Sequence, residues 1–145
     1  MPRKLRGYLN PQAHFIVMRD QDQSDCERTK ESLEALCALA GRQATVRIAC
    51  RELEAFYLGD LAAVEAGLKI PGLGALQNKA RFRDPDRVVC PAFELQKLTK
   101  NRYQKVAGSR AIAPHLNLTA PRSKSFHHLI ETIRAISSDL AASGG

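Results

Sequence analysis

The sequence predicts an α/β fold in which a small parallel sheet is flanked by helices. Four consecutive apolar residues within residues 15–19 are typical of a strand that is buried on both faces. A second run, at residues 44–50, alternates apolar and polar side chains, as half-buried strands do. A helical pattern separates the two runs. Two strands joined by one helix form a right-handed βαβ unit, so we expect them to pair in parallel.

The other expected elements are mostly helices. The first should cover residues 25–40, because Ser24 and Glu27 form a capping-box pattern before an apolar stripe and Gly41 follows as a C-terminal stop. Further helical patterns occur at residues 51–58, 60–68, 91–100 and 125–140. Turn-forming residues at 71–74 and 84–86 separate them, and residues 87–90 are a candidate third strand.

The composition fits one globular domain over residues 1–145. A chain of 145 residues with 44% hydrophobic content lies within the usual single-domain range. No apolar run approaches the ~20 residues that a membrane span requires, and the basic first ten residues lack the apolar core of a signal peptide. The cysteines and histidines show no zinc-site spacing. We therefore expect a cytoplasmic protein with reduced thiols and no membrane contact.

The net charge of +7 is unevenly distributed. Residues 20–66 contain ten acidic and five basic residues, whereas residues 76–124 contain eleven basic and three acidic ones. Residues 84–145 thus form a basic, mostly helical C-terminal portion. Basic side chains interleaved with aromatic ones suit a phosphate backbone, and the candidate nucleic-acid contacts are Lys97, Lys100, Arg102 and Arg110. The alternative is a face that merely keeps the protein soluble.

Three aspartates follow the first apolar run with the spacing D-x-D-x-x-D. Asp20, Asp22 and Asp25 would lie just past the carboxyl end of a buried strand, where open α/β sheets bind ligands. Crowded carboxylates raise one another's pKa, so the pattern favours a neutralising divalent cation such as Mg²⁺, Mn²⁺ or Ca²⁺. The alternative is a solvated acidic turn in which Asp22 or Ser24 caps the next helix.

A second acidic pattern begins where the second strand ends. In a parallel sheet, Glu52 and Glu54 would emerge at the same edge as Asp20 and Asp22. Apolar residues at 53, 56 and 57 would face the core and leave both glutamates on the flanks of the first helical turn. The helix dipole alone also favours acidic residues in a first turn, which explains one glutamate more easily than two.

Several segments together resemble an uncharacterised bacterial family called domain of unknown function 4276. They are residues 19–22, the pair Asp25 and Cys26 together with Lys30, residues 47–60, residues 103–105 and residues 123–126. That family is similar to Toprim domains, the metal-dependent catalytic modules of topoisomerases, primases and overcoming-lysogenisation-type nucleases. Its members are often encoded beside an ATPase in settings that suggest phage defence. The resemblance therefore implies a Toprim-like fold and a nucleic-acid-cleaving partner of such an ATPase.

The resemblance also implies roles for particular residues. Asp20 and Asp22 match the D-x-D positions that would bind Mg²⁺ or Mn²⁺, Glu52 or Glu54 would complete the site, and Lys105 would steady a phosphoryl oxygen. A Toprim domain normally begins with a strand that ends in Glu-Gly, but no glutamate occurs among residues 1–13. We therefore expect an N-terminally short domain with an open sheet edge, which pairing in a homodimer would cover.

Three functions remain open from the sequence. The first is a Mg²⁺-dependent nuclease or nuclease-derived subunit that acts with a partner ATPase. The second is a non-catalytic module that keeps the fold and binds a partner protein or nucleic acid. The third is a phosphatase or another enzyme of small phosphate compounds on the same scaffold, because a fold does not fix a substrate.

Overall fold

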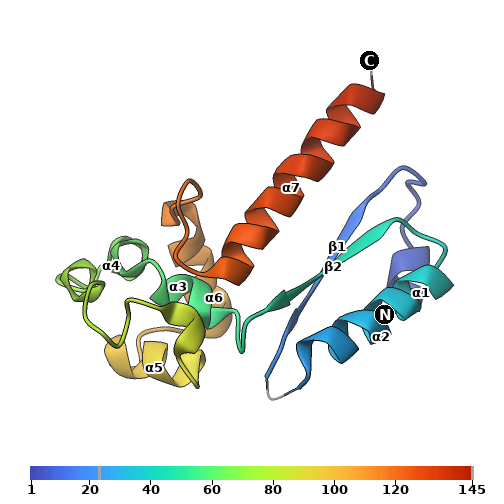
Figure 1. The fold of residues 1–145 in the computed structure, drawn as a ribbon. Coiled ribbons are helices and arrows are strands. Elements are labelled where there is room, and N and C mark those ends of the chain that lie inside the picture. Colours follow the sequence, from blue (N-terminus) through green and yellow to red (C-terminus); the bar gives the residue numbers. More distant parts are fainter. Residues whose placement is uncertain (23, 145) are drawn as a thin grey trace.

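The computed structural model describes residues 1–22 and 24–144, and it confirms an α/β fold with a small parallel sheet flanked by helices (Figure 1). The strands are β1 (Phe15–Asp20) and β2 (Ala44–Ala49). The α-helices are α1 (Pro2–Arg6), α2 (Cys26–Leu39), α3 (Glu54–Leu58), α4 (Leu61–Leu68), α5 (Pro91–Leu98), α6 (Lys105–Ile112) and α7 (Lys124–Ser143). Three short 3-10 helices are η1 (Gly74–Leu76), η2 (Pro85–Arg87) and η3 (Ala113–His115).

The two strands pair in parallel, with Phe15 beside Ala44 at one end and Asp20 beside Ala49 at the other. On one face, apolar side chains of both strands pack against α1 and α2 in a small core that includes Leu5, Leu33 and Val46. The N-terminal half of α7 crosses the other face, and its C-terminal half projects away from the sheet (Figure 1). The sheet is therefore covered by helices from both sides.

A larger core lies beyond the carboxyl ends of the strands, where α3 to α6 gather (Figure 1). Its members include the fully buried side chains of Leu61, Val64, Leu95 and Ile112. The buried amide of Gln77 holds the surrounding loop: its Nε2 donates to the carbonyl oxygens of residues 58 and 82, and its Oε1 accepts from the backbone N–H of Leu61 at 2.7 Å. This helical body is the platform against which the strand ends rest.

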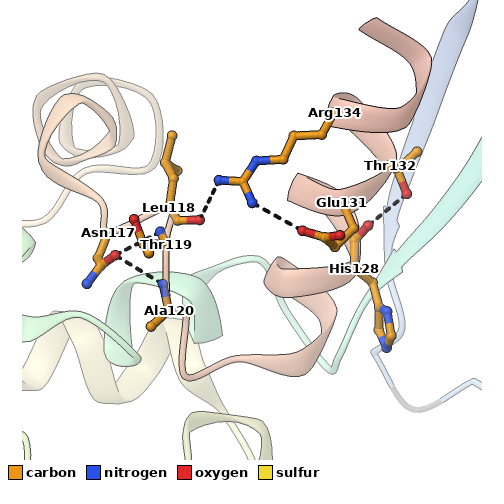
Figure 2. A network of polar contacts seen from close by, with 8 residues as sticks. All are labelled: Asn117, Leu118, Thr119, Ala120, His128, Glu131, Thr132 and Arg134. Atoms are coloured by element: carbon orange, nitrogen blue, oxygen red, sulfur yellow. Dashed lines mark hydrogen bonds and ion pairs between the residues drawn. The ribbon is translucent and has the colours of Figure 1, made fainter. Parts of the chain in front are cut away.

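The start of α7 is tied to the loop that precedes it (Figure 2). Arg134 donates from Nη2 to the carbonyl oxygen of Leu118 at 3.1 Å, and its Nη1 lies 3.1 Å from Glu131 Oε1. The Asn117 side chain accepts hydrogen bonds from the backbone N–H groups of residues 119 and 120. The Arg134 hydrogen bond to Leu118 therefore links the middle of α7 to the loop that precedes this helix.

Three expectations about individual elements are wrong. Residues 87–90 form no strand: η2 ends at Arg87, and the sheet has two strands within the described residues. The N-cap of α2 is Asp25 rather than Ser24. The helix expected at residues 51–58 begins only at Glu54, because the backbone of Arg51 turns in the left-handed conformation, with φ at 59°.

No helix in the described part of the chain is both long and apolar enough to span a bilayer.

Candidate functional site

The carboxyl ends of the two strands carry the predicted acidic residues side by side. The parallel pairing continues past the strands, since Gln21 N donates to the carbonyl oxygen of Ala49 at 3.0 Å and Asp22 N to that of Arg51 at 2.8 Å. Residues 20–22 therefore run alongside residues 49–52. This confirms the expectation that the two acidic segments emerge at the same edge of the sheet.

Asp20 sits at the centre of this acidic edge. Its Oδ1 accepts a hydrogen bond from the backbone N–H of Leu53 at 2.9 Å, which fixes the carboxylate against the turn before α3. Partial burial is the main cause that raises the pKa of Asp20, and the negative charges of Asp22 and Glu52 raise it further. The Leu53 hydrogen bond and the positive charge of Lys105 oppose that rise. Three of the other predicted site residues, Asp22, Glu52 and Lys105, thus act electrostatically on Asp20.

The backbone at this edge is strained. Asp22 and Arg51 both adopt the left-handed conformation, with φ at 52° and 59°. A residue other than glycine held in this region costs about 1–3 kcal/mol, and such residues concentrate at functional sites. The two strained residues also bond to each other through the Asp22 N–H and the Arg51 carbonyl. Lys69, Lys100 and Asn101 adopt the same conformation elsewhere in the chain, so the strain supports a candidate site here only together with the carboxylates.

Glu52 connects the acidic edge to the helical body. Its Oε2 accepts a hydrogen bond from the backbone N–H of Ala92 at 2.7 Å, in the first turn of α5. A cavity of about 640 Å³ opens beside the carboxylates, and its walls include Asp22, Arg51, Glu52 and Cys90. A ligand in this cavity would meet the carboxylates of Asp22 and Glu52 directly.

Glu54 does not join this group. It is 4% exposed and lies in the helical body, where its Oε1 accepts a hydrogen bond from the Tyr103 hydroxyl at 3.1 Å. The same hydroxyl lies 3.2 Å from Ser109 Oγ. The expected position on the flank of a helical turn is therefore wrong for Glu54, because α3 has only five residues and all of them are buried.

We predict that Glu54 stabilises the fold rather than supporting chemistry. Replacing Glu54 with Ala should lower the free energy of unfolding by about 1–3 kcal/mol, because it removes the partner of a buried hydroxyl. Replacing Glu54 with Gln keeps an acceptor oxygen at that place and should cost much less. Urea denaturation of both variants measures the difference. Equal losses in the two variants would contradict a role based on the hydrogen bond to Tyr103.

Asp25 is engaged by a helix end. Its Oδ1 accepts a hydrogen bond from the backbone N–H of Arg28 at 3.0 Å, so the carboxylate serves as the N-cap of α2. Over residues 1–22 and 24–144, no three histidine, cysteine, aspartate or glutamate side chains are arranged ready to hold a metal ion. The carboxylates that the fold brings together are Asp20, Asp22 and Glu52.

The four predicted nucleic-acid contacts lie on the surface of the helical body. Lys97 is in the last turn of α5, Lys100 and Arg102 follow in the connection to α6, and Arg110 is in the last turn of α6. All four are exposed. Arg102 also donates from Nη2 to the carbonyl oxygen of Leu68 at 3.1 Å, which ties this connection to the end of α4. Each of the four side chains is therefore accessible to an anionic partner.

A family model described as Domain of unknown function (DUF4276) matches residues 2–134. The chain belongs to this family. No significant match was found among curated proteins or among solved structures. Membership of DUF4276 agrees with the resemblance of the short segments, and the match covers β1, β2 and the acidic edge between them.

Four of the five segments that resemble DUF4276 meet at a second cavity, of about 520 Å³. Residues of these four segments make up most of its walls: Gln21, Cys26, Lys30, Arg47, Ile48, Cys50, Lys124 and Ser125. The other lining residues are Val46, Asp86 and His128. No pattern in the sequence marks the basic residues here as a group. Lys30, Arg47 and Lys124 come from three segments that are distant in the sequence. The one feature they share in the sequence is that each lies in a segment that resembles DUF4276.

Proposed function

We propose that this chain is a Toprim-like, Mg²⁺-dependent nuclease or nuclease-derived subunit that acts on nucleic acid. The observation that carries the proposal is the gathering of Asp20, Asp22 and Glu52 at the carboxyl ends of two parallel strands, with the positive charge of Lys105 in reach of Asp20. Carboxylates in such a group favour a hard divalent cation, and a nearby lysine favours a phosphoryl oxygen.

The donor atoms at the acidic edge fit Mg²⁺ or Mn²⁺. One oxygen each of Asp20 and Glu52 accepts a backbone N–H, which leaves the second oxygen of each for other partners. Mg²⁺ usually keeps several waters and takes only one or two carboxylates, so a closed set of three protein ligands is not required. When bound, the ion would supply an activated water and stabilise the leaving oxygen. Asp20 and Asp22 would hold it, and Lys105 would orient the phosphoryl group.

The proposed partners and cellular location of this chain are supported by the family resemblance and by the exposed basic residues of α5 and α6. The proposal includes a partner ATPase and a role in phage defence, because members of the family that the chain resembles are often encoded beside an ATPase in such settings. The exposed basic residues of α5 and α6 support binding of nucleic acid. The described cysteines are free thiols, which suits a reducing cytoplasm.

Cleavage assays test the nuclease proposal. Single-stranded and duplex DNA and RNA are incubated with the chain in Mg²⁺, in Mn²⁺ and in EDTA. We expect cleavage that EDTA abolishes and that Asp22→Asn lowers by at least about 10²-fold, the scale of a lost transition-state contact. Asp25→Asn is the matched control, because Asn also caps helices and the Asp25 carboxylate is engaged by the end of α2. Cleavage that persists in EDTA would refute the metal mechanism.

A non-catalytic interaction module is the second candidate. It is favoured by the sheet, in which β1 has no described strand on its outer edge and its four apolar residues are only half-buried. An open edge of this kind is a template for pairing with another chain. Binding of a partner or of nucleic acid without any metal-dependent cleavage would favour this module over the nuclease.

We also predict that the chain forms a homodimer, with β1 in the contact. Ile16 is half-buried, and it packs against neither of the two cores, so Ile16→Lys should weaken the dimer at little cost to the fold. Sedimentation at micromolar concentration should show a dimer for the unmodified chain and a monomer for the variant. Leu118→Lys, at an exposed apolar residue distant from β1, is the control. A monomeric unmodified chain would contradict the prediction.

A further inference from the structure

The cavity of about 520 Å³ lies along β2, between the first turns of α2 and α7. Lys30 of α2, Arg47 of β2 and Lys124 of α7 contribute cationic side chains to its walls. His128 contributes an imidazole, and Figure 2 shows it on the side of α7 that is nearer to the strands. Three elements that are distant in sequence therefore direct nitrogen donors to one space.

The formal charge of this cavity is positive because three cationic side chains and one carboxylate line it, and that carboxylate is already hydrogen-bonded. Asp86 Oδ1 accepts from the Ser123 hydroxyl at 2.7 Å, and Asp86 Oδ2 accepts from the backbone N–H of Lys124 at 2.7 Å. Both oxygens thus bind the start of α7. Burial is the main cause that raises the pKa of the Cys50 thiol, so this group stays protonated and adds no negative charge.

Arg47 is held in place as a donor. Its Nε donates to Thr132 Oγ1 at 2.6 Å and its Nη1 to the carbonyl oxygen of Val46 at 3.0 Å, and its remaining amino group, Nη2, has no partner among the described residues. Neither Arg47 nor Lys124 forms an ion pair within the described residues. Lys30 pairs with Glu34 at 3.8 Å, but both side chains are about half exposed, so this contact is weak.

We infer that this cavity binds a nucleoside monophosphate unit, with the phosphate dianion held by Lys30, Arg47 and Lys124. A guanidinium and two ammonium groups form charge-assisted hydrogen bonds with phosphate oxygens. The volume exceeds what a phosphate alone would fill and lies within the range of small-molecule sites. Ile48, which is only partly buried, provides an apolar part of the wall against which a base can rest.

The cavity lies next to the acidic edge of the sheet. Gln21 lines the cavity and lies between Asp20 and Asp22 in the chain, so the cationic cavity adjoins the acidic edge. If the acidic edge cleaves a strand, the unit bound here is the terminal nucleotide of that strand, with its 5′-phosphate against the three cations. This assignment to a strand end rests on the proposed function, whereas the binding of a phosphate dianion does not.

Fluorescence anisotropy with matched ligands tests the inference. Two short single-stranded DNA molecules that differ only in a 5′-phosphate or a 5′-hydroxyl are titrated in EDTA, where no metal-dependent cleavage occurs. A free 5′-mononucleotide is then used as a competitor. We expect the 5′-phosphate to tighten binding by about tenfold or more, as charge-assisted hydrogen bonds to a dianion can supply. We also expect the mononucleotide to compete with the phosphorylated strand.

Two double variants of equal charge separate the cavity from general electrostatics. Lys30→Gln with Lys124→Gln should remove the preference for the 5′-phosphate, and both lysines are exposed, so the fold is retained. Lys4→Gln with Lys79→Gln removes two exposed charges outside the cavity and should leave the preference unchanged. Loss of the preference in both pairs would overturn the inference, because the effect would then follow net charge.

The remaining outcomes are also decisive. Equal affinity for the two strands, together with no competition by the mononucleotide, would refute a phosphate site in this cavity. Competition by the mononucleotide without any preference between the strands would support the phosphate site and refute its assignment to a strand end. A chain that prefers the 5′-phosphate but cleaves nothing would leave the cavity in place and refute only the proposed nuclease.

Discussion

Replacing Asp20 and Asp22 together with Asn is expected to abolish the rise in Tm that Mg²⁺ gives the unmodified chain. An ion that binds only the folded state stabilises it by mass action, by about 2.7 kcal/mol at a concentration of about 100 Kd. A domain near this size gains roughly 2–4 °C in Tm per kcal/mol. Thermal unfolding across a Mg²⁺ titration should therefore show a rise of about 5–10 °C that the double variant lacks.

The substitution is suited to this test because Asn preserves the local hydrogen bond. Leu53 N donates to Asp20 Oδ1, and an Asn side chain offers an oxygen at the same place. The turn before α3 should therefore stay intact while two negative charges are lost. Asp25→Asn, at the N-cap of α2, should keep the full response to Mg²⁺. A metal response that survives in the double variant would refute the assignment of Asp20 and Asp22.

The pH dependence of stability gives an independent readout of the same group. The pKa of Asp20 is raised above its ordinary value of 3.8, so the folded chain binds this proton more tightly than the unfolded chain does. The resulting stabilisation is present below pH 3.8 and is lost as the pH rises through the raised pKa. Without metal, Asp20→Asn should therefore raise Tm at neutral pH, which a purely structural aspartate would not do.

The parts of the fold that sequence analysis predicted depend on local patterns. Residues 15–49 form a strand, a helix and a second strand, and this order follows from apolar spacing and helix-stop signals. Each of these signals depends only on residues that are close together in the sequence. Parallel pairing then brings Asp20 and Glu52 to one edge, because the carboxyl ends of parallel strands always meet there. The central part of the candidate site was predictable for this reason.

The parts that were missed depend on contacts between distant segments. From the sequence, Glu54 was expected to lie beside Glu52. Its hydrogen-bond partner Tyr103 is 49 residues away in the sequence, and the contact between them lies inside the helical body. The cationic cavity likewise needs Arg47 to meet Thr132 of α7, across 85 residues. Propensity and periodicity say nothing about such contacts, so neither the burial of Glu54 nor the grouping of Lys30 and Lys124 could be predicted.

The second large effect is expected in nucleic-acid binding. Affinity for duplex DNA should fall steeply as salt increases, with a log-log slope of about −0.9 for each phosphate that the protein neutralises. Replacing Lys97, Lys100 and Arg102 with Gln should flatten this slope by about one unit per lost phosphate contact. The three residues lie together at the end of α5 and the start of its connection to α6, so one stretch of backbone can contact them all.

A triple variant with the same change in net charge makes the comparison specific. Arg3, Lys4 and Arg28 are exposed and lie on α1 and α2, away from the helical body. Replacing these three with Gln should leave the slope close to that of the unmodified chain, because local contacts and not total charge release the counterions. Equal flattening in the two variants would mean that the surface of α5 and α6 is not the binding face. Binding that does not respond to salt would remove nucleic acid from the function and leave the protein-binding module.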